Sequence, residues 1–169
     1  ALHENDLLIL ASIRREVSLV MGKAVLAQLN DRAAEVRFSN LSNVAAIATR
    51  GPLTPDHIIR TKRSAVILSG NPPEDIERFA KAYRQYFAQF NNGQLTSLDA
   101  APRWAVWPGQ GTIAFGRSAA DIRIISDITA QTIRAIQWAE ALGGWKTLSQ
   151  KDLFEMEYWE LEQAKLKKA

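Results

Sequence analysis

The sequence contains no cysteine and only two histidines, His3 and His57. The absence of cysteine excludes a disulfide scaffold, a thiolate zinc site, an iron–sulfur cluster and a cysteine nucleophile. Two distant histidines do not supply a multi-histidine metal site, and no His-x-His, His-Glu-x-x-His or Ser-His-Asp arrangement occurs. The residue types on which most metal and thiol chemistry depends are therefore scarce in this chain.

Long apolar runs and a strong excess of one charge are also absent. No run approaches the about 18 consecutive apolar residues of a transmembrane helix, and residues 1–6 lack the basic region of a signal peptide. The 21 basic and 18 acidic residues are well mixed and give a net charge of +3, whereas nucleic-acid-binding proteins concentrate their basic residues. We therefore expect a cytoplasmic protein with neither a membrane nor a nucleic acid as its partner.

Helical and strand patterns alternate along the 169 residues, a length that fits about one domain. Apolar residues at helical spacing predict helices, and short apolar runs, of which 24–29 is expected to be buried, predict strands. The expected helices run through residues 7–20, 41–48, 76–90, 122–139 and 153–164, and the expected strands are 24–29, 65–68, 103–107 and 112–115. This order predicts an α/β fold, a small layered α/β/α unit with a mixed sheet of four or five strands and flanking helices.

Glycines surround the second strand of the predicted hairpin. Gly109-Gln110-Gly111 precedes it and Gly116-Arg117-Ser118 follows it, and Ser118 with Asp121 is typical of a helix cap. Neither the Walker A spacing nor the dinucleotide-binding spacing is present. A tight turn between two strands is one interpretation. An anion site made by backbone amides and the helix start at Ser118 is the alternative.

His57, Arg60 and Lys62 lie in a polar connector between the second helix and the second strand. Several interpretations are open: a surface loop or a histidine that caps a backbone group, an anion-binding cluster, and a catalytic histidine. The pattern assigns no catalytic residue. His57, Arg60 and Lys62 are the candidates for contact with a substrate or its phosphate.

Five tryptophans are many for a chain of this length. Trp104 and Trp107 are three residues apart, so on a regular strand they face opposite sides of the sheet. Tyr158 and Trp159 pose the same question on the last helix. Core packing is one interpretation, and contact with a neighbouring domain through Trp107, Tyr158 and Trp159 is the other.

Two long stretches resemble a known family. Residues 51–63, GPLTPDHIIRTKR, and residues 152–166, DLFEMEYWELEQAKL, resemble segments of bacterial proteins that fuse a class II aldolase/adducin-type domain to a short-chain dehydrogenase, the rhamnulose-1-phosphate aldolase/alcohol dehydrogenase family. By this resemblance the chain is a middle segment, with the aldolase metal histidines upstream and the nucleotide-binding glycines downstream. The resemblance implies a parent enzyme of rhamnose metabolism that cleaves a deoxyketose 1-phosphate with a divalent metal and oxidises the released aldehyde with NAD.

A finer similarity concerns the predicted hairpin. Class II aldolases carry a strand, Asn-His-Gly, a second strand and Gly-Lys/Arg-Thr/Ser before a long helix, and that histidine binds the metal. Residues 104–118 resemble this layout, but Gln110 stands in place of the histidine, and a neutral amide is a poor zinc ligand. The resemblance thus implies that residues 1–148 form an aldolase-like segment without a metal site or cofactor, and that residues 149–169 are a helical linker toward the dehydrogenase domain.

The last predicted helix carries more apolar residues than a single stripe accommodates. We expect part of it to pack on the domain and part to be exposed, for other domains of the same polypeptide or for a homo-oligomer. The segment is expected to be inactive alone and to act as a structural or substrate-binding part of the parent. The alternatives are a non-catalytic interdomain or oligomerisation module, and a free-standing enzyme that uses His57 as a base.

Overall fold

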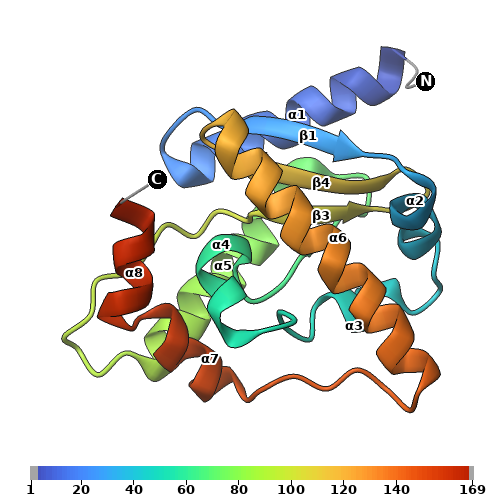
Figure 1. The fold of residues 1–169 in the computed structure, drawn as a ribbon. Helices are drawn as coiled ribbons and strands as arrows, with labels where there is room; N and C mark the ends of the chain where they lie inside the picture. Colours follow the sequence, from blue (N-terminus) through green and yellow to red (C-terminus); the bar gives the residue numbers. More distant parts are fainter. Residues whose placement is uncertain (1–3, 168–169) are drawn as a thin grey trace.

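The computed structural model describes residues 4–167. Helices and strands alternate as the sequence predicts, with short helical segments inserted before the second strand (Figure 1). The elements are α1 (Glu4–Met21), β1 (Leu26–Asn30), α2 (Ala33–Ser39), α3 (Val44–Ala48), η1 (Pro55–His57), α4 (Ile58–Thr61), β2 (Val66–Ile67), α5 (Pro72–Phe90), β3 (Trp104–Trp107), β4 (Gly111–Gly116), α6 (Ala119–Ala141), α7 (Gln150–Glu157) and α8 (Glu160–Lys167).

The four strands form one mixed sheet in the order β1-β4-β3-β2. β3 and β4 are the predicted antiparallel hairpin, β1 pairs with β4 antiparallel, and β2 pairs with β3 parallel. All four predicted strands therefore join the sheet, and the mixed α/β class is confirmed. The first strand differs from the prediction of a buried strand at 24–29: it begins at Leu26, lies at one end of the sheet, and leaves Leu26 49% exposed.

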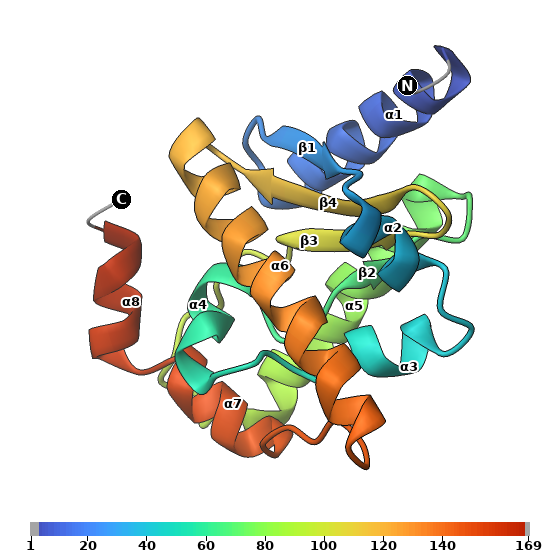
Figure 2. The ribbon, with the colours of Figure 1, turned by 45° about the vertical axis from the view of Figure 1, so that its right-hand side comes forward.

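Helices cover both faces of the sheet (Figure 2). On one face α2, α3 and α6 enclose a core that contains Trp104 and Val106, and on the other α1 and α5 enclose a core that contains Ala105. Trp107 packs against this second core and is partly buried. The predicted placement of Trp104 and Trp107 on opposite faces is confirmed, because side chains alternate along a strand.

The C-terminal segment forms two helices where the sequence predicts one. The helical conformation is interrupted at Tyr158 and Trp159, between α7 and α8. Phe154 and Tyr158 are buried in an aromatic cluster with residues of α5, whereas Trp159 is 50% and Leu161 63% exposed. The expected division into a packed part and an exposed part is therefore present, but Tyr158 belongs to the interior of this chain.

A buried ion pair joins α7 to the end of α4. The Lys62 ammonium lies 3.3 Å from Glu157 Oε1, and the two side chains are 3% and 0% exposed. The Tyr83 hydroxyl, from α5, donates to the same Glu157 oxygen at 2.9 Å, and Lys62 sits 3.9 Å from the centroid of the Tyr83 ring. Lys62 has a left-handed backbone with φ of 61°. Three separate segments thus meet at one pair of charges.

Burial sets the protonation behaviour of this pair. Desolvation lowers the pKa of the Lys62 ammonium to about 8, even though the Glu157 carboxylate favours the charged form. For Lys62 the loss of water outweighs the attraction of the Glu157 carboxylate, and desolvation often exceeds the Coulombic gain in buried ion pairs. Loss of either partner alone nevertheless leaves the other charge buried and uncompensated.

The pair predicts a strongly non-additive mutational cycle. We expect Lys62→Met and Glu157→Gln each to lower the free energy of unfolding by about 3–5 kcal/mol, and the double variant to lose clearly less than their sum. Urea denaturation of the four proteins measures this. The exposed Lys151–Glu155 pair on α7, 3.8 Å apart, is the matched control, whose loss changes stability by less than about 1 kcal/mol. Additive losses for Lys62 and Glu157 would contradict the pairing.

The lowered pKa of Lys62 also predicts a dependence of stability on pH. The ordinary lysine pKa of 10.5 falls to about 8 in the folded chain, so between these values the unfolded state holds a proton that the folded state has released. The contribution of Lys62 to the free energy of unfolding therefore increases as pH rises from about 8 to about 10.5, and the folded state becomes more stable. We expect the difference in stability between the parent chain and Lys62→Met to increase over this window; an unchanged difference would contradict the shift.

Candidate functional site

A polar cleft of about 440 Å³ lies at the end of the sheet where β4 runs into α6. Its walls come from the C-terminal end of α1, from α4, from the segment before β3, from the β4–α6 turn and from α8, elements that Figure 1 places around the start of α6. The lining residues are Met21, Lys23, Ile59, Arg60, Asp99, Arg103, Gly116, Arg117, Ser118, Asp121, Ile124, Ile125 and Leu166. A cleft of this volume is typical of small-molecule sites.

Positive charge predominates among the lining residues. Lys23, Arg60, Arg103 and Arg117 contribute four positive charges against the two negative charges of Asp99 and Asp121, which leaves +2. Within residues 4–167 the side chains of Lys23 and Arg117 have no ion-pair or hydrogen-bond partner. The charge of the cleft is therefore only partly neutralised by the protein itself.

Asp99 holds Arg103 in a two-pronged ion pair. Arg103 Nη1 donates to Asp99 Oδ1 at 2.9 Å and Nη2 donates to Oδ2 at 2.7 Å. Burial alone would raise the pKa of Asp99, but the Arg103 guanidinium and the Lys62 charge outweigh it and hold this pKa below its usual value. The pair stays ionised and fixes one wall of the cleft.

The β4–α6 turn is fixed by two reciprocal bonds. Ser118 Oγ accepts from the Asp121 amide at 3.1 Å, which confirms the predicted cap, and Asp121 Oδ2 accepts from the Arg117 amide at 3.1 Å. A Cβ added at Gly116 would lie 2.7 Å from Asp121 Cβ, so only glycine fits. Gly109-Gln110-Gly111 lies at the other end of β4, so the two glycine groups do not form one loop.

The structure does not gather the three anion-binding candidates predicted from the polar connector. Arg60 lines the cleft, where its Nη2 donates to the Lys165 carbonyl at 3.2 Å. His57 ends η1, does not line the cleft, and its buried Nδ1 has no hydrogen-bond partner among residues 4–167. Lys62 faces Glu157 in the interior. Phosphate binding by His57 and Arg60 stays a prediction, while Lys62 presents no charge to solvent.

Sequence reasoning missed three of the four cleft cations, namely Lys23, Arg103 and Arg117 as binding residues. Lys23 is far in the chain from Arg103 and Arg117, which flank the β3–β4 hairpin, and each is an ordinary surface residue by its local pattern. The only available signal was the Gly116-Arg117-Ser118 turn before a capped helix, which the sequence analysis weighed as an anion site.

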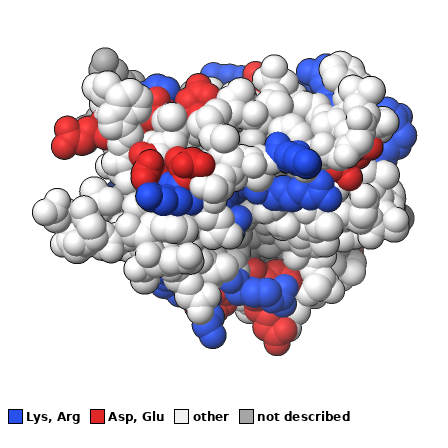
Figure 3. Space-filling view, turned by 90° about the horizontal axis from the view of Figure 1, so that it is seen from below, with Lys and Arg blue, Asp and Glu red and all other residues white. Residues whose placement is uncertain are grey.

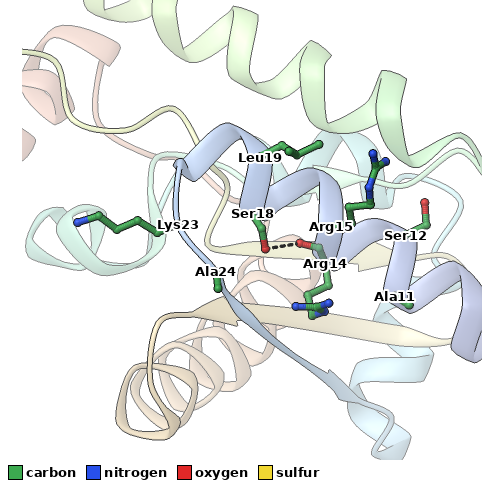
Figure 4. Close-up of a pocket in the computed structure, with 8 residues that line it drawn as sticks. All are labelled: Ala11, Ser12, Arg14, Arg15, Ser18, Leu19, Lys23 and Ala24. Carbon is green, nitrogen blue, oxygen red and sulfur yellow. Dashed lines mark hydrogen bonds between the residues drawn. The ribbon is translucent and has the colours of Figure 1, made fainter.

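A second hollow of about 620 Å³ lies along α1. In Figure 4 its polar side chains diverge: Lys23 points away from the others, and Ser18 Oγ bonds the Arg14 carbonyl at 2.8 Å. Arg14 Nη1 donates to the Val25 carbonyl at 3.4 Å. These polar groups are directed at backbone instead of converging on a common point, so the cleft is the better candidate site.

The remaining predicted features are placed as follows. Gln110 is partly exposed in the β3–β4 turn, and residues 4–167 contain no group of three or more His, Cys, Asp or Glu side chains arranged to hold a metal ion. None of the helices described is long and apolar enough to cross a membrane. On the face shown in Figure 3, basic and acidic side chains lie interspersed among uncharged surface.

Comparison with known proteins identifies a family and a curated relative. The family described as "Aldolase class II, second domain" matches residues 4–166. The "Uncharacterized oxidoreductase YuxG" of Bacillus subtilis (strain 168) is 26% identical over 156 residues, which are 85% of this chain and 23% of that protein. The chain thus spans about a quarter of that relative.

A solved structure shares the fold. The crystal structure of YgbL from Escherichia coli, a candidate aldolase/epimerase/decarboxylase, superposes with a TM-score of 0.51 and 14% identity over 87% of this chain. The match covers 64% of the YgbL chain. At this identity the likeness concerns the fold alone.

Proposed function

Because the chain belongs to the family of class II aldolase second domains, we propose that it is one domain of a longer sugar-metabolising enzyme that combines class II aldolase and short-chain dehydrogenase activities. The family match from residue 4 to residue 166, through every described helix and strand, carries this proposal. The oxidoreductase name of the Bacillus subtilis relative, about four times as long as the matched part, supports it.

The proposed parent cleaves a deoxyketose 1-phosphate, as in rhamnose metabolism, and oxidises the aldehyde product. A divalent metal would polarise the substrate carbonyl and NAD would accept the hydride. The residues described here do not fit either group, since Gln110 stands where the resemblance places a metal histidine and no dinucleotide-binding glycine pattern occurs. The proposal therefore assigns both groups to other parts of the polypeptide.

Within that enzyme the chain is a scaffold that contributes to substrate binding. The cleft supports this role, because it joins a partly uncompensated positive charge to apolar walls. Arg60, from the stretch that carries the family resemblance, is the predicted residue that lies in it. The chain is proposed to be inactive alone.

A second candidate function is an interdomain or oligomerisation module. Trp159 and Leu161, at the start of α8, and Trp138 and Leu142, at the end of α6, are at least half exposed, and exposed apolar surface is typical of contact sites. The partly buried Trp107 offers less apolar surface for such a role.

The test of the proposed function uses the full-length polypeptide. We expect metal-dependent cleavage of rhamnulose 1-phosphate and reduction of NAD by the released aldehyde, with neither activity in the 169-residue chain alone. Both steps are measured by product analysis and by NADH absorbance. A full-length protein that cleaves no deoxyketose 1-phosphate, or an isolated chain that does, would overturn the proposal.

Sedimentation velocity of Trp159→Ser against the parent chain tests the second candidate function, the interdomain or oligomerisation module.

A further inference from the structure

We propose that the cleft formed by Lys23, Arg60, Arg103 and Arg117 binds the phosphate group of a small polyhydroxylated phosphomonoester. This inference names the ligand class and the contacts of the site, and it rests on the proposed function only for the identity of the physiological ligand. The binding itself follows from the charges and shape of the cleft.

The net charge of the residues that line the cleft fits a phosphate dianion. Four cations and two carboxylates line the cleft and leave +2, which matches the charge of a phosphomonoester above its second pKa of about 6. Like charges that line one cleft repel each other, so an arriving dianion removes an unfavourable interaction. A monocarboxylate neutralises only half of this excess.

The basic side chains of the cleft differ in whether the protein already holds them in hydrogen bonds. Asp99 holds Arg103 with bonds of 2.9 and 2.7 Å, which keeps that guanidinium in a fixed orientation. The side chains of Lys23 and Arg117 have no partner among the described residues, and the Arg60 side chain donates to the Lys165 carbonyl. A phosphate with three acceptor oxygens can accept from several such donors at once.

The β4–α6 turn also favours a bound phosphate. Ser118 Oγ accepts from the Asp121 amide, so its own hydroxyl proton remains to be donated to a ligand oxygen. The positive end of α6, a helix of 23 residues, adds to the field of the four cations at this point. Gly116 lets the turn lie close to Asp121, because a side chain at this position would clash with Asp121 Cβ.

The walls indicate what carries the phosphate. Ile59, Ile124 and Leu166 provide apolar contact for a carbon skeleton, and the Asp99 and Asp121 carboxylates can accept from hydroxyl groups. The volume of about 440 Å³ accommodates a small metabolite within the range of ligand pockets. A phosphorylated polyol combines all of these features.

The test is a titration of the isotopically labelled 169-residue chain with glycerol 3-phosphate and with inorganic phosphate, followed by NMR at constant ionic strength. We expect saturable shifts of the Gly116, Arg117 and Ser118 amides with both, and none with glycerol. Arg117→Gln and Lys23→Gln should each weaken binding about tenfold, the effect of one charge-assisted contact. Arg134→Gln, an exposed residue elsewhere on α6, removes the same charge and should leave binding unchanged.

Binding of glycerol 3-phosphate should also strengthen between pH 5 and pH 7.5, as the phosphate becomes a dianion with its second pKa of about 6, whereas binding of acetate should not. Equal weakening by Arg134→Gln and Arg117→Gln, or shifts that never saturate, would overturn the inference. Its failure is separate from that of the proposed function: the chain can bind phosphate even if the full-length protein has neither proposed activity.

Discussion

The buried pair of Lys62 and Glu157 is the constraint that fixes α7 against α4 and α5. Two charges that are 3% and 0% exposed have to stay together, because either one alone would be stranded away from water. Since Lys62 follows α4 and Glu157 ends α7, the pair ties these helices to one another. Tyr83 adds α5 to the same point through its bond to Glu157.

The ion pair also sets the wall of the cleft. Arg60 precedes Lys62 by two residues on α4, and it lines the cleft while Lys62 faces the interior. The left-handed backbone at Lys62 turns the chain at this point. Asp99, which also lines the cleft, orients Arg103, and the charges of Arg103 and Lys62 hold the pKa of Asp99 below its usual value despite its burial. The buried charges and the cleft charges therefore form one connected arrangement. The family match separately relates the chain to class II aldolases.

The parts of the fold that follow from local chemistry could be predicted from the sequence. The β3–β4 hairpin, the cap of α6 at Ser118 and the mixed sheet are written in short-range patterns. The burial of Lys62 is not, because its partner lies 95 residues away and a lysine between Thr61 and Arg63 looks solvated. The cleft could not be predicted for the same reason. Lys23 and Arg117 line one cleft only because of the sheet order, in which β1 lies beside β4.

The central claim is that α7 is an integral part of the domain through Glu157. Native-state hydrogen exchange of the amides of residues 150–157 tests it most directly. The account predicts that these amides exchange only through the global unfolding that also exposes β3 and β4, with the same free energy of opening. Exchange of α7 at a much lower free energy, while β3 and β4 stay protected, would contradict the account and identify the segment as an appended linker.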